Sequence, residues 1–216
     1  EHTRTNCPNT MRDALSSTLG VTVTGESVFA YVYGLLGTGA FSQDFAEELT
    51  PGTGYAHVPL SASRDLFQRA VDLGAELMFL HTWGIVDWGG QTAAPPATRV
   101  LAHPSTTPSS FAFDAETGEI AFGDGRVGPV SEQAWAFEVS GLKVLQAWLS
   151  QRMENPGGKK SSDLDLIGPD NWNESEELCR VVDMVQGTLD RTPRALALLG
   201  EITEGEVLTA SQVGIP

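Results

Sequence analysis

The chain has 216 residues, of which 41% are hydrophobic and 19% are charged, a composition typical of a soluble globular protein. Its formal net charge of −15 is opposite to the charge that nucleic-acid-binding proteins usually carry. The 13 lysines and arginines can nevertheless cluster on one face of the fold. No apolar run approaches the roughly 20 residues that span a bilayer, and no signal-peptide pattern opens the sequence, so we expect no membrane segment.

The two cysteines, Cys7 and Cys179, lie far apart in unrelated contexts, so a disulfide framework is not expected. This cysteine usage fits a reducing cytoplasm. None of the four histidines has the spacing of a metal site. Because the chain begins at Glu1 rather than at a methionine, we expect it to be a piece of a longer protein.

The first part of the chain predicts an irregular lead-in over residues 1–25 and then three helices. Apolar residues recur with helical spacing over residues 28–36, and at four-residue intervals over residues 41–49. A longer helix is predicted over residues 63–82, with a serine at its N-cap. Gly74 inside that helix costs about 1 kcal/mol relative to alanine, so we expect another element to pack closely against it.

The middle of the chain predicts strands. Residues 84–110 are rich in Gly, Pro, Ser and Thr and are predicted to form a long loop, with a possible strand over residues 99–102. Residues 111–122 have the pattern of a β-hairpin closed by a turn that contains glycine.

The spacing of apolar residues changes within residues 130–152. Large apolar residues alternate over residues 135–139, which predicts a strand. Helical spacing follows over residues 142–152, so Ser140 is predicted as the N-cap and residues 139–142 as a strand-to-helix turn. The aromatic residues of this stretch are expected in the core.

The last part predicts two helices and a tail. One helix begins near Asn171 or Asn173 and continues to about Leu189, and a second begins at Thr192 with Pro193 at its first position. Residues 201–216 are predicted to be a frayed tail. The fold class is therefore α+β, with helices flanking a small antiparallel sheet in a single domain over residues 26–200.

The sequence lacks the motifs of an independent enzyme. No nucleophile elbow, Walker loop or Gly-x-Gly-x-x-Gly follows a predicted strand. We therefore expect this chain to have no catalytic residue, no metal site and no cofactor of its own.

Basic residues are the candidates for contacts with DNA, although a single basic residue is more often a solvated surface charge. Lys159 and Lys160, in a Gly/Ser loop, suit phosphates, whereas Arg99 and Arg126 flank the predicted hairpin and suit base edges. The full set of candidates is Arg64, Arg69, Arg99, Arg126, Lys143, Arg152, Lys159 and Lys160.

Several segments resemble a known family. Residues 27–36 are similar to the helix YVYALLHSP, residues 58–81 to RIP…F…LG..L..LH, and residues 130–152 to W.F.VGGY.VL..WL..R. These patterns belong to the C-terminal target-recognition (specificity) domain of type ISP restriction-modification enzymes. The resemblance implies a domain that reads double-stranded DNA without catalysis. It also implies a neighbouring N6-adenine methyltransferase domain, which binds S-adenosylmethionine, in the parent chain of a bacterial phage-defence enzyme.

The acidic composition leaves a second function open. In that alternative, the chain is a protein-interaction or scaffolding domain of the same parent enzyme and makes no direct contact with DNA. A continuous basic cleft favours DNA recognition, and an unbroken acidic surface favours scaffolding.

Overall fold

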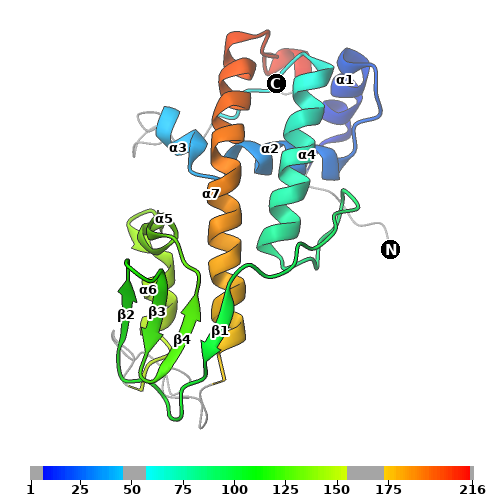
Figure 1. Cartoon of the computed structure of the whole chain (residues 1–216). Helices are drawn as coiled ribbons and strands as arrows, with labels where there is room; N and C mark the ends of the chain where they lie inside the picture. The colour runs from blue at the N-terminus through cyan, green and yellow to red at the C-terminus, as the bar shows by residue number, and fades with distance from the viewer. Residues whose placement is uncertain (1–6, 46–56, 155–172, 215–216) are drawn as a thin grey trace, which may run out of the picture. The chain divides into compact units, whose positions relative to one another are not determined.

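The computed structural model describes residues 7–45, 57–154 and 173–214 (Figure 1). They form two compact units, which we call the helical unit (Glu1–Ala93 with Asp190–Pro216) and the sheet unit (Ala94–Leu189). Helices together with a small antiparallel sheet confirm the predicted α+β class. The boundaries of a recognition domain over residues 26–200 stay a prediction. Among the described residues, no helix combines the length and apolar character needed to cross a bilayer.

The helical unit begins with a helix that the sequence did not predict. Helix α1, Asn9–Leu19, lies within the predicted irregular lead-in, so that prediction is wrong for these residues. Leu15 and Leu19 are fully or almost fully buried, and Gly20 ends the helix in the left-handed conformation. Two leucines one turn apart are enough to anchor a mostly polar helix to a core.

Two other predicted helices of this unit are confirmed: α2 is Gly25–Leu36 and α4 is Arg64–His81. Helix α3, Ala40–Asp44, confirms the start of the helix predicted over residues 41–49, of which residues 46–49 lie outside the described residues. Ser63 caps α4 as predicted, because its hydroxyl accepts a hydrogen bond from the backbone N–H of Leu66 at 3.4 Å. The unit's core holds apolar side chains from these helices and from the end of α7, including Tyr31, Leu35, Phe67, Leu73, Leu77 and Leu198.

Helices α2 and α4 touch backbone to backbone. A Cβ added at Gly74 would lie 1.8 Å from the carbonyl oxygen of Ala30, and one added at Gly34 would lie 2.3 Å from that of Ala70. The predicted close packing at Gly74 is therefore confirmed.

The C-terminal part of the chain is more regular than predicted. Helix α7, Ser175–Glu204, contains Pro193 in its interior, so the predicted new helix at Thr192 is wrong. The predicted frayed tail is also wrong, because Leu208 and Val213 are buried and Val207 pairs with Ser61 in an isolated β-bridge. Burial of these apolar side chains outweighs the polar character of the surrounding sequence.

The sheet unit is built on four antiparallel strands: β1 (Arg99–Ala102), β2 (Phe111–Asp114), β3 (Glu119–Phe122) and β4 (Gly125–Gly128). Their spatial order is β1-β4-β3-β2, which confirms the predicted hairpin and the predicted strand at residues 99–102. One face of the sheet is closed by the core, where Ile120, Phe122 and Val127 pack with side chains from α6 (Val144–Ser150) and from the start of α7.

Residues 130–152 differ from the prediction. The predicted strand over residues 135–139 is partly wrong, because Trp135 and Ala136 belong to helix α5, Glu132–Ala136, which Ser131 caps, whereas Glu138 and Val139 do form a strand. The predicted strand-to-helix turn joins two strands instead, β5 (Glu138–Val139) and β6 (Leu142–Lys143). Ser140 and Gly141 have φ angles of 51° and 80°, typical of a two-residue hairpin turn. Helix α6 begins directly after this hairpin, at Val144, so Ser140 is not its N-cap.

Candidate nucleic-acid interface

Within the described part of the chain, one face of the sheet is not covered by a hydrophobic core, and we call it the open face. Strand residues alternate between the two faces. Arg99 and Leu101 of β1 and Arg126 of β4 are exposed, whereas Val127 is fully buried on the other side. Strands β1 and β4 are hydrogen-bonded neighbours. The structure thus brings the two arginines that the sequence predicted for base contacts onto one face of adjacent strands.

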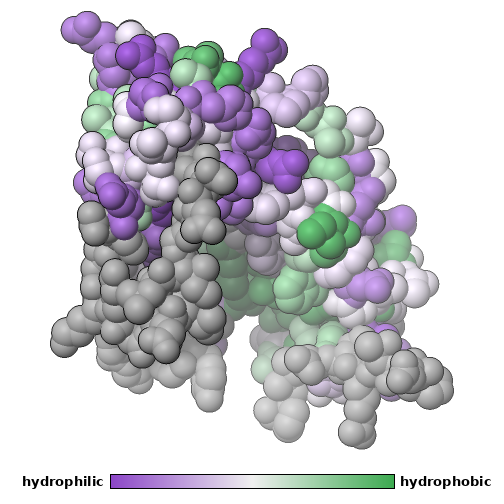
Figure 2. All heavy atoms as spheres, turned by 90° about the horizontal axis from the view of Figure 1, so that it is seen from below, coloured by the Kyte–Doolittle hydropathy of each residue, from purple (hydrophilic) through white to green (hydrophobic). Residues whose placement is uncertain are grey.

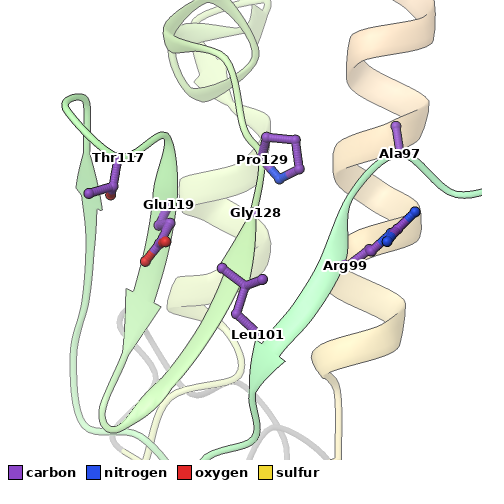
Figure 3. A pocket seen from close by; sticks show the side chains of 7 residues that line it. All are labelled: Ala97, Arg99, Leu101, Thr117, Glu119, Gly128 and Pro129. Carbon is purple, nitrogen blue, oxygen red and sulfur yellow. The ribbon is translucent and has the colours of Figure 1, made fainter.

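The open face is hollowed beside Arg99. Figure 3 shows the pocket, which is lined by Ala97, Arg99, Leu101, Thr117, Glu119, Gly128 and Pro129. Gly128 keeps it open, because a Cβ there would lie 3.3 Å from Cγ of Glu119 and 3.4 Å from Cδ1 of Leu101. The lining of the pocket thus includes a cation, a carboxylate and apolar carbon.

Glu119 and Arg126 form an exposed ion pair on this face. Nη1 of Arg126 lies 3.7 Å from Oε2 of Glu119, and the two side chains are 61% and 27% exposed. Water screens such a pair, so its net contribution to stability is small. The guanidinium can therefore exchange this contact for a ligand at little cost.

Hydrogen bonds to the two residues before Arg99 hold the start of strand β1. Asp183 of α7 accepts hydrogen bonds from the backbone N–H groups of Ala97 and Thr98 at 3.2 and 2.9 Å. The Thr98 hydroxyl donates to the carbonyl of Pro129 at 3.2 Å. These contacts determine where the backbone of Arg99 lies, so its side chain projects from a rigid support.

Arg152 and Lys143, in the same unit, differ in environment. The guanidinium of Arg152 lies 3.9 Å from the ring centre of Trp148 and 3.4 Å from carboxylate oxygens of both Glu174 and Glu177. Lys143 is exposed on β6, opposite Glu138. Arg152 is therefore largely occupied within the protein, while Lys143 remains available to a ligand.

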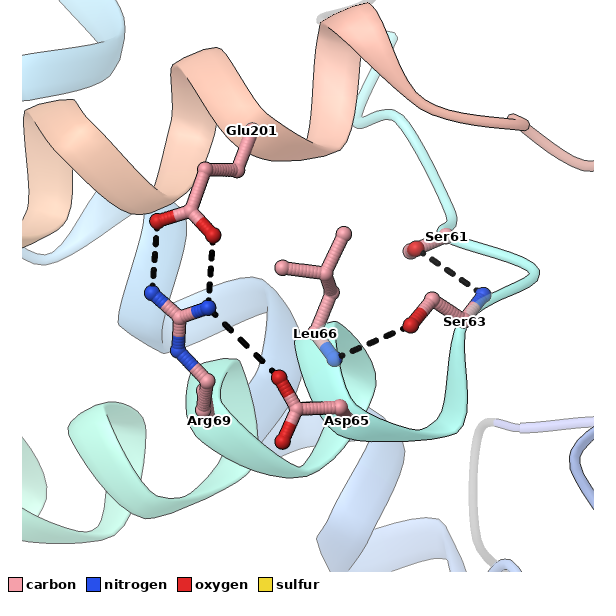
Figure 4. Close-up of polar contacts among 6 residues, drawn as sticks. All are labelled: Ser61, Ser63, Asp65, Leu66, Arg69 and Glu201. Atoms are coloured by element: carbon pink, nitrogen blue, oxygen red, sulfur yellow. Dashed lines mark hydrogen bonds and ion pairs between the residues drawn. The ribbon is translucent and has the colours of Figure 1, made fainter.

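Arg64 and Arg69 lie on α4 in the helical unit. Arg69 donates two hydrogen bonds of 2.6 Å to the carboxylate of Glu201 and lies 3.5 Å from Asp65 (Figure 4). The hydrogen bonds that Arg69 donates to Glu201 raise the pKa of Arg69, and the same contact lowers the pKa of Glu201. Arg64 is exposed at the first position of the helix. Lys159 and Lys160 lie outside the described residues.

Replacing Arg69 with alanine is expected to lower the thermal unfolding temperature modestly at pH 7. The folded state depresses the pKa of Glu201, so the pair stabilises the protein above the ordinary glutamate pKa of 4.5 and loses this effect as the pH falls through the lower folded value. The difference in unfolding temperature between wild type and Arg69→Ala should therefore shrink below pH 4.5. Arg64→Ala, which removes a neighbouring exposed arginine, is the control, and a pH-independent difference for Arg69→Ala would contradict the assignment.

Other residues of the site were not predicted from the sequence. Glu119, Leu101 and Pro129 join the site only because three separate strands or strand ends meet there. The only signal of Glu119 was its alternation with the apolar residues Ile120 and Phe122. Among the residues that the structure describes, no group of three or more His, Cys, Asp or Glu side chains is arranged to hold a metal ion.

The exposed apolar residues are scattered over several elements. In Figure 2, hydrophobic and hydrophilic residues are interspersed on the coloured part of the face shown. Phe29 of α2, Val139 of β5 and Leu142 of β6 are examples of large apolar side chains that are about half exposed. Val139 and Leu142 are partners across the β5–β6 hairpin, and the ring of Phe29 contacts that of the exposed Trp88, so these residues form small apolar groups.

Comparison with known proteins identifies the family. The sequence matches the family model of the Type ISP C-terminal specificity domain over residues 1–183, as the sequence resemblance implies. Among solved structures, the fold is similar to a chain in the cryo-EM structure of the DrdV–DNA complex, with 19% identity and a TM-score of 0.56 over 86% of this chain and 19% of that chain. It is also similar to a nuclease-deletion mutant of the Type ISP restriction-modification enzyme LlaGI in complex with a DNA substrate mimic, with 17% identity and a TM-score of 0.50 over 87% and 14% of the two chains.

The match to the family model is stronger evidence of family than the similarity to these solved structures. The chain spans less than one fifth of the length of both solved chains, and identities this low establish only a shared fold. No curated protein matches the sequence. The family model covers most of the chain, and the chain therefore belongs to the family of Type ISP C-terminal specificity domains.

Proposed function

We propose that this chain is the DNA target-recognition domain of a bacterial restriction-modification enzyme, and that it positions the parent enzyme on its site without catalysing a reaction. Membership of the specificity-domain family over residues 1–183 carries this proposal. In the proposed setting, the parent is a cytoplasmic phage-defence enzyme. Its methyltransferase domain modifies adenine at N6 with bound S-adenosylmethionine and is the intramolecular partner of this chain.

The open face of the sheet has the chemistry for reading bases. The major groove of DNA presents hydrogen-bonding groups and the methyl group of thymine. Strands β1 and β4 pair at one edge of the four-stranded sheet and carry Arg99, Leu101 and Arg126. Arginine pairs with O6 and N7 of guanine, and an apolar side chain contacts the methyl group of thymine.

Phosphate contacts need cations but carry no sequence information. Arg64, Lys143, Lys159 and Lys160 are the proposed phosphate contacts. Arg69 and Arg152 contribute less, because both are engaged by carboxylates of the same chain. A net charge of −15 is an average over the chain, so it is compatible with local groups of cations that bind DNA.

The net charge of −15 is also the observation that favours the alternative of an acidic scaffolding domain. Selection of bound sequences from a randomised double-stranded DNA pool, with the full-length enzyme that carries this chain, separates the two. A recognition domain enriches a defined motif, and transplanting this chain into a related enzyme transfers that motif. A motif that does not follow the chain would support scaffolding.

Replacing Lys159 and Lys160 together with alanine is expected to weaken binding to all DNA sequences alike. Each phosphate contact releases about one counterion from the DNA when the protein binds. Loss of two such contacts should therefore make the slope of log K against log[salt] shallower by about two units. Binding titrations over a range of salt concentrations measure this slope, and the selected motif should be unchanged. A changed motif at an unchanged salt slope would assign the two lysines to base reading instead.

A further inference from the structure

We propose that Glu119 and Arg126 together read one C·G base pair, with Glu119 as a specificity-determining residue. In this arrangement, the carboxylate of Glu119 accepts a hydrogen bond from the N4 amino group of cytosine. The guanidinium of Arg126 donates to O6 or N7 of the guanine paired with that cytosine. The inference rests on the proposed function and names what one part of the open face recognises.

The distance between the two side chains suits this base pair. Oε2 of Glu119 and Nη1 of Arg126 are 3.7 Å apart. In the major groove, cytosine N4 and guanine O6 are the two ends of one Watson–Crick hydrogen bond, roughly 2.9 Å apart. An acceptor and a donor side by side on the protein therefore face a donor and an acceptor side by side on the DNA.

The backbone holds both residues in position for such a contact. Ala121 of β3 pairs directly with Arg126 of β4, so Glu119, two residues before Ala121, is a diagonal cross-strand neighbour of Arg126 on the same face. Gly128 of β4 leaves room for the Glu119 side chain, which lines the pocket in Figure 3. The Arg99 side chain extends from β1 away from Glu119 in that view, which leaves Arg126 as the cation that faces the carboxylate.

A carboxylate selects cytosine by excluding the other bases. Guanine offers only the acceptors N7 and O6 to this groove, thymine offers the acceptor O4, and adenine places the acceptor N7 beside its amino group. Each of these acceptors repels a carboxylate. Glu119 would thus weaken binding to wrong sequences as well as favour the right one, which is how specific interfaces discriminate.

The test compares sequence preferences of the full-length enzyme and its variants, again by selection from a randomised DNA pool. Wild type should require C·G at one position. Glu119→Gln should reduce discrimination at that position by about 5- to 150-fold and shift it towards adenine, because a glutamine amide can pair with N6 and N7 of adenine. Arg126→Ala should relax the same position, because both side chains contact the same base pair.

Glu116→Gln is the matched control, since it removes the same charge from the exposed turn of the same hairpin and should leave the motif unchanged. Thermal unfolding of each variant checks that the fold is intact. A wild-type motif that Glu119→Gln leaves unchanged would overturn this inference alone, as would changes at different positions for Glu119→Gln and Arg126→Ala. A wild type that selects no motif would overturn the proposed function, and this inference with it.

Discussion

Gly74→Ala is expected to unfold the helical unit at temperatures at which the wild type is fully folded. The new methyl carbon would lie 1.8 Å from the carbonyl oxygen of Ala30 and 2.9 Å from the backbone nitrogen of Gly34. Both are backbone atoms, so no side-chain rotation relieves the clash, and α2 and α4 must move apart. That movement opens the core around Tyr31 and Leu77, so the cost should exceed the typical overpacking penalty of about 1–3 kcal/mol.

Gly200→Ala supplies the matched control within the same unit. Gly200 also lies inside a helix, but a Cβ there would meet no atom within 4 Å. Alanine is favoured over glycine in a helix interior by about 1 kcal/mol, so this variant should unfold at a higher temperature than wild type. Thermal unfolding followed by circular dichroism compares the three proteins. A Gly74→Ala protein that unfolds at or above the wild-type temperature would show that the helices do not make this contact.

Helical periodicity in the sequence predicted much of the helical unit. A glycine inside a predicted helix, which is unfavourable for the helix itself, predicted the close helix crossing. Apolar spacing alone identifies α2 and α4, whose bounds match the predicted ranges closely. A glycine at position 74 weakens the helix but allows the backbone of α2 to approach closely, and the backbone of Gly34 lies beside it. Helix α1 was missed because few apolar residues, Met11, Leu15 and Leu19, pack against the core, and distant residues of the chain build that core.

Residues 132–139 show where local pattern fails. Trp135, Phe137 and Val139 alternate as in a strand, yet Trp135 lies in helix α5 and stacks on Phe113 of β2 at 5.3 Å. Over so few residues, the apolar pattern does not distinguish a strand from a single turn of helix. The cap at Ser131 and the contact with the sheet decide the outcome.

The sequence was sufficient to select the basic residues of the candidate site, but not to predict which acidic residues lie beside them. Arg99 and Arg126 stood out because they flank a recognisable hairpin, and the sheet brings them onto one face. Arg69 meets Glu201 from 132 residues away, a pairing that only the folded chain creates. Glu119 owes its place beside Arg126 to the strand register, which apolar alternation alone does not determine.

Arg99→Ala in the full-length enzyme is expected to abolish the requirement for guanine at one position of the recognised sequence. Arg99 is exposed on an edge strand whose backbone Asp183 holds in place through the two preceding residues. Its removal leaves no buried partner behind, so the free energy of unfolding should stay within about 0.5 kcal/mol of wild type. A bidentate contact with guanine is worth about 1–3 kcal/mol of discrimination, so about 5- to 150-fold is lost.

Arg99→Lys separates the charge of this side chain from its shape. Lysine keeps the positive charge but lacks the planar fork that donates two parallel hydrogen bonds. Binding to random DNA should therefore be retained in Arg99→Lys, while discrimination at the guanine position falls below the wild-type level. Binding titrations on sites that differ only at that base pair measure both quantities. Arg99→Ala could instead keep the complete motif and lose only affinity, which Arg99→Lys then restores. That result would assign Arg99 to a phosphate, and strand β1 would position the DNA without reading that base.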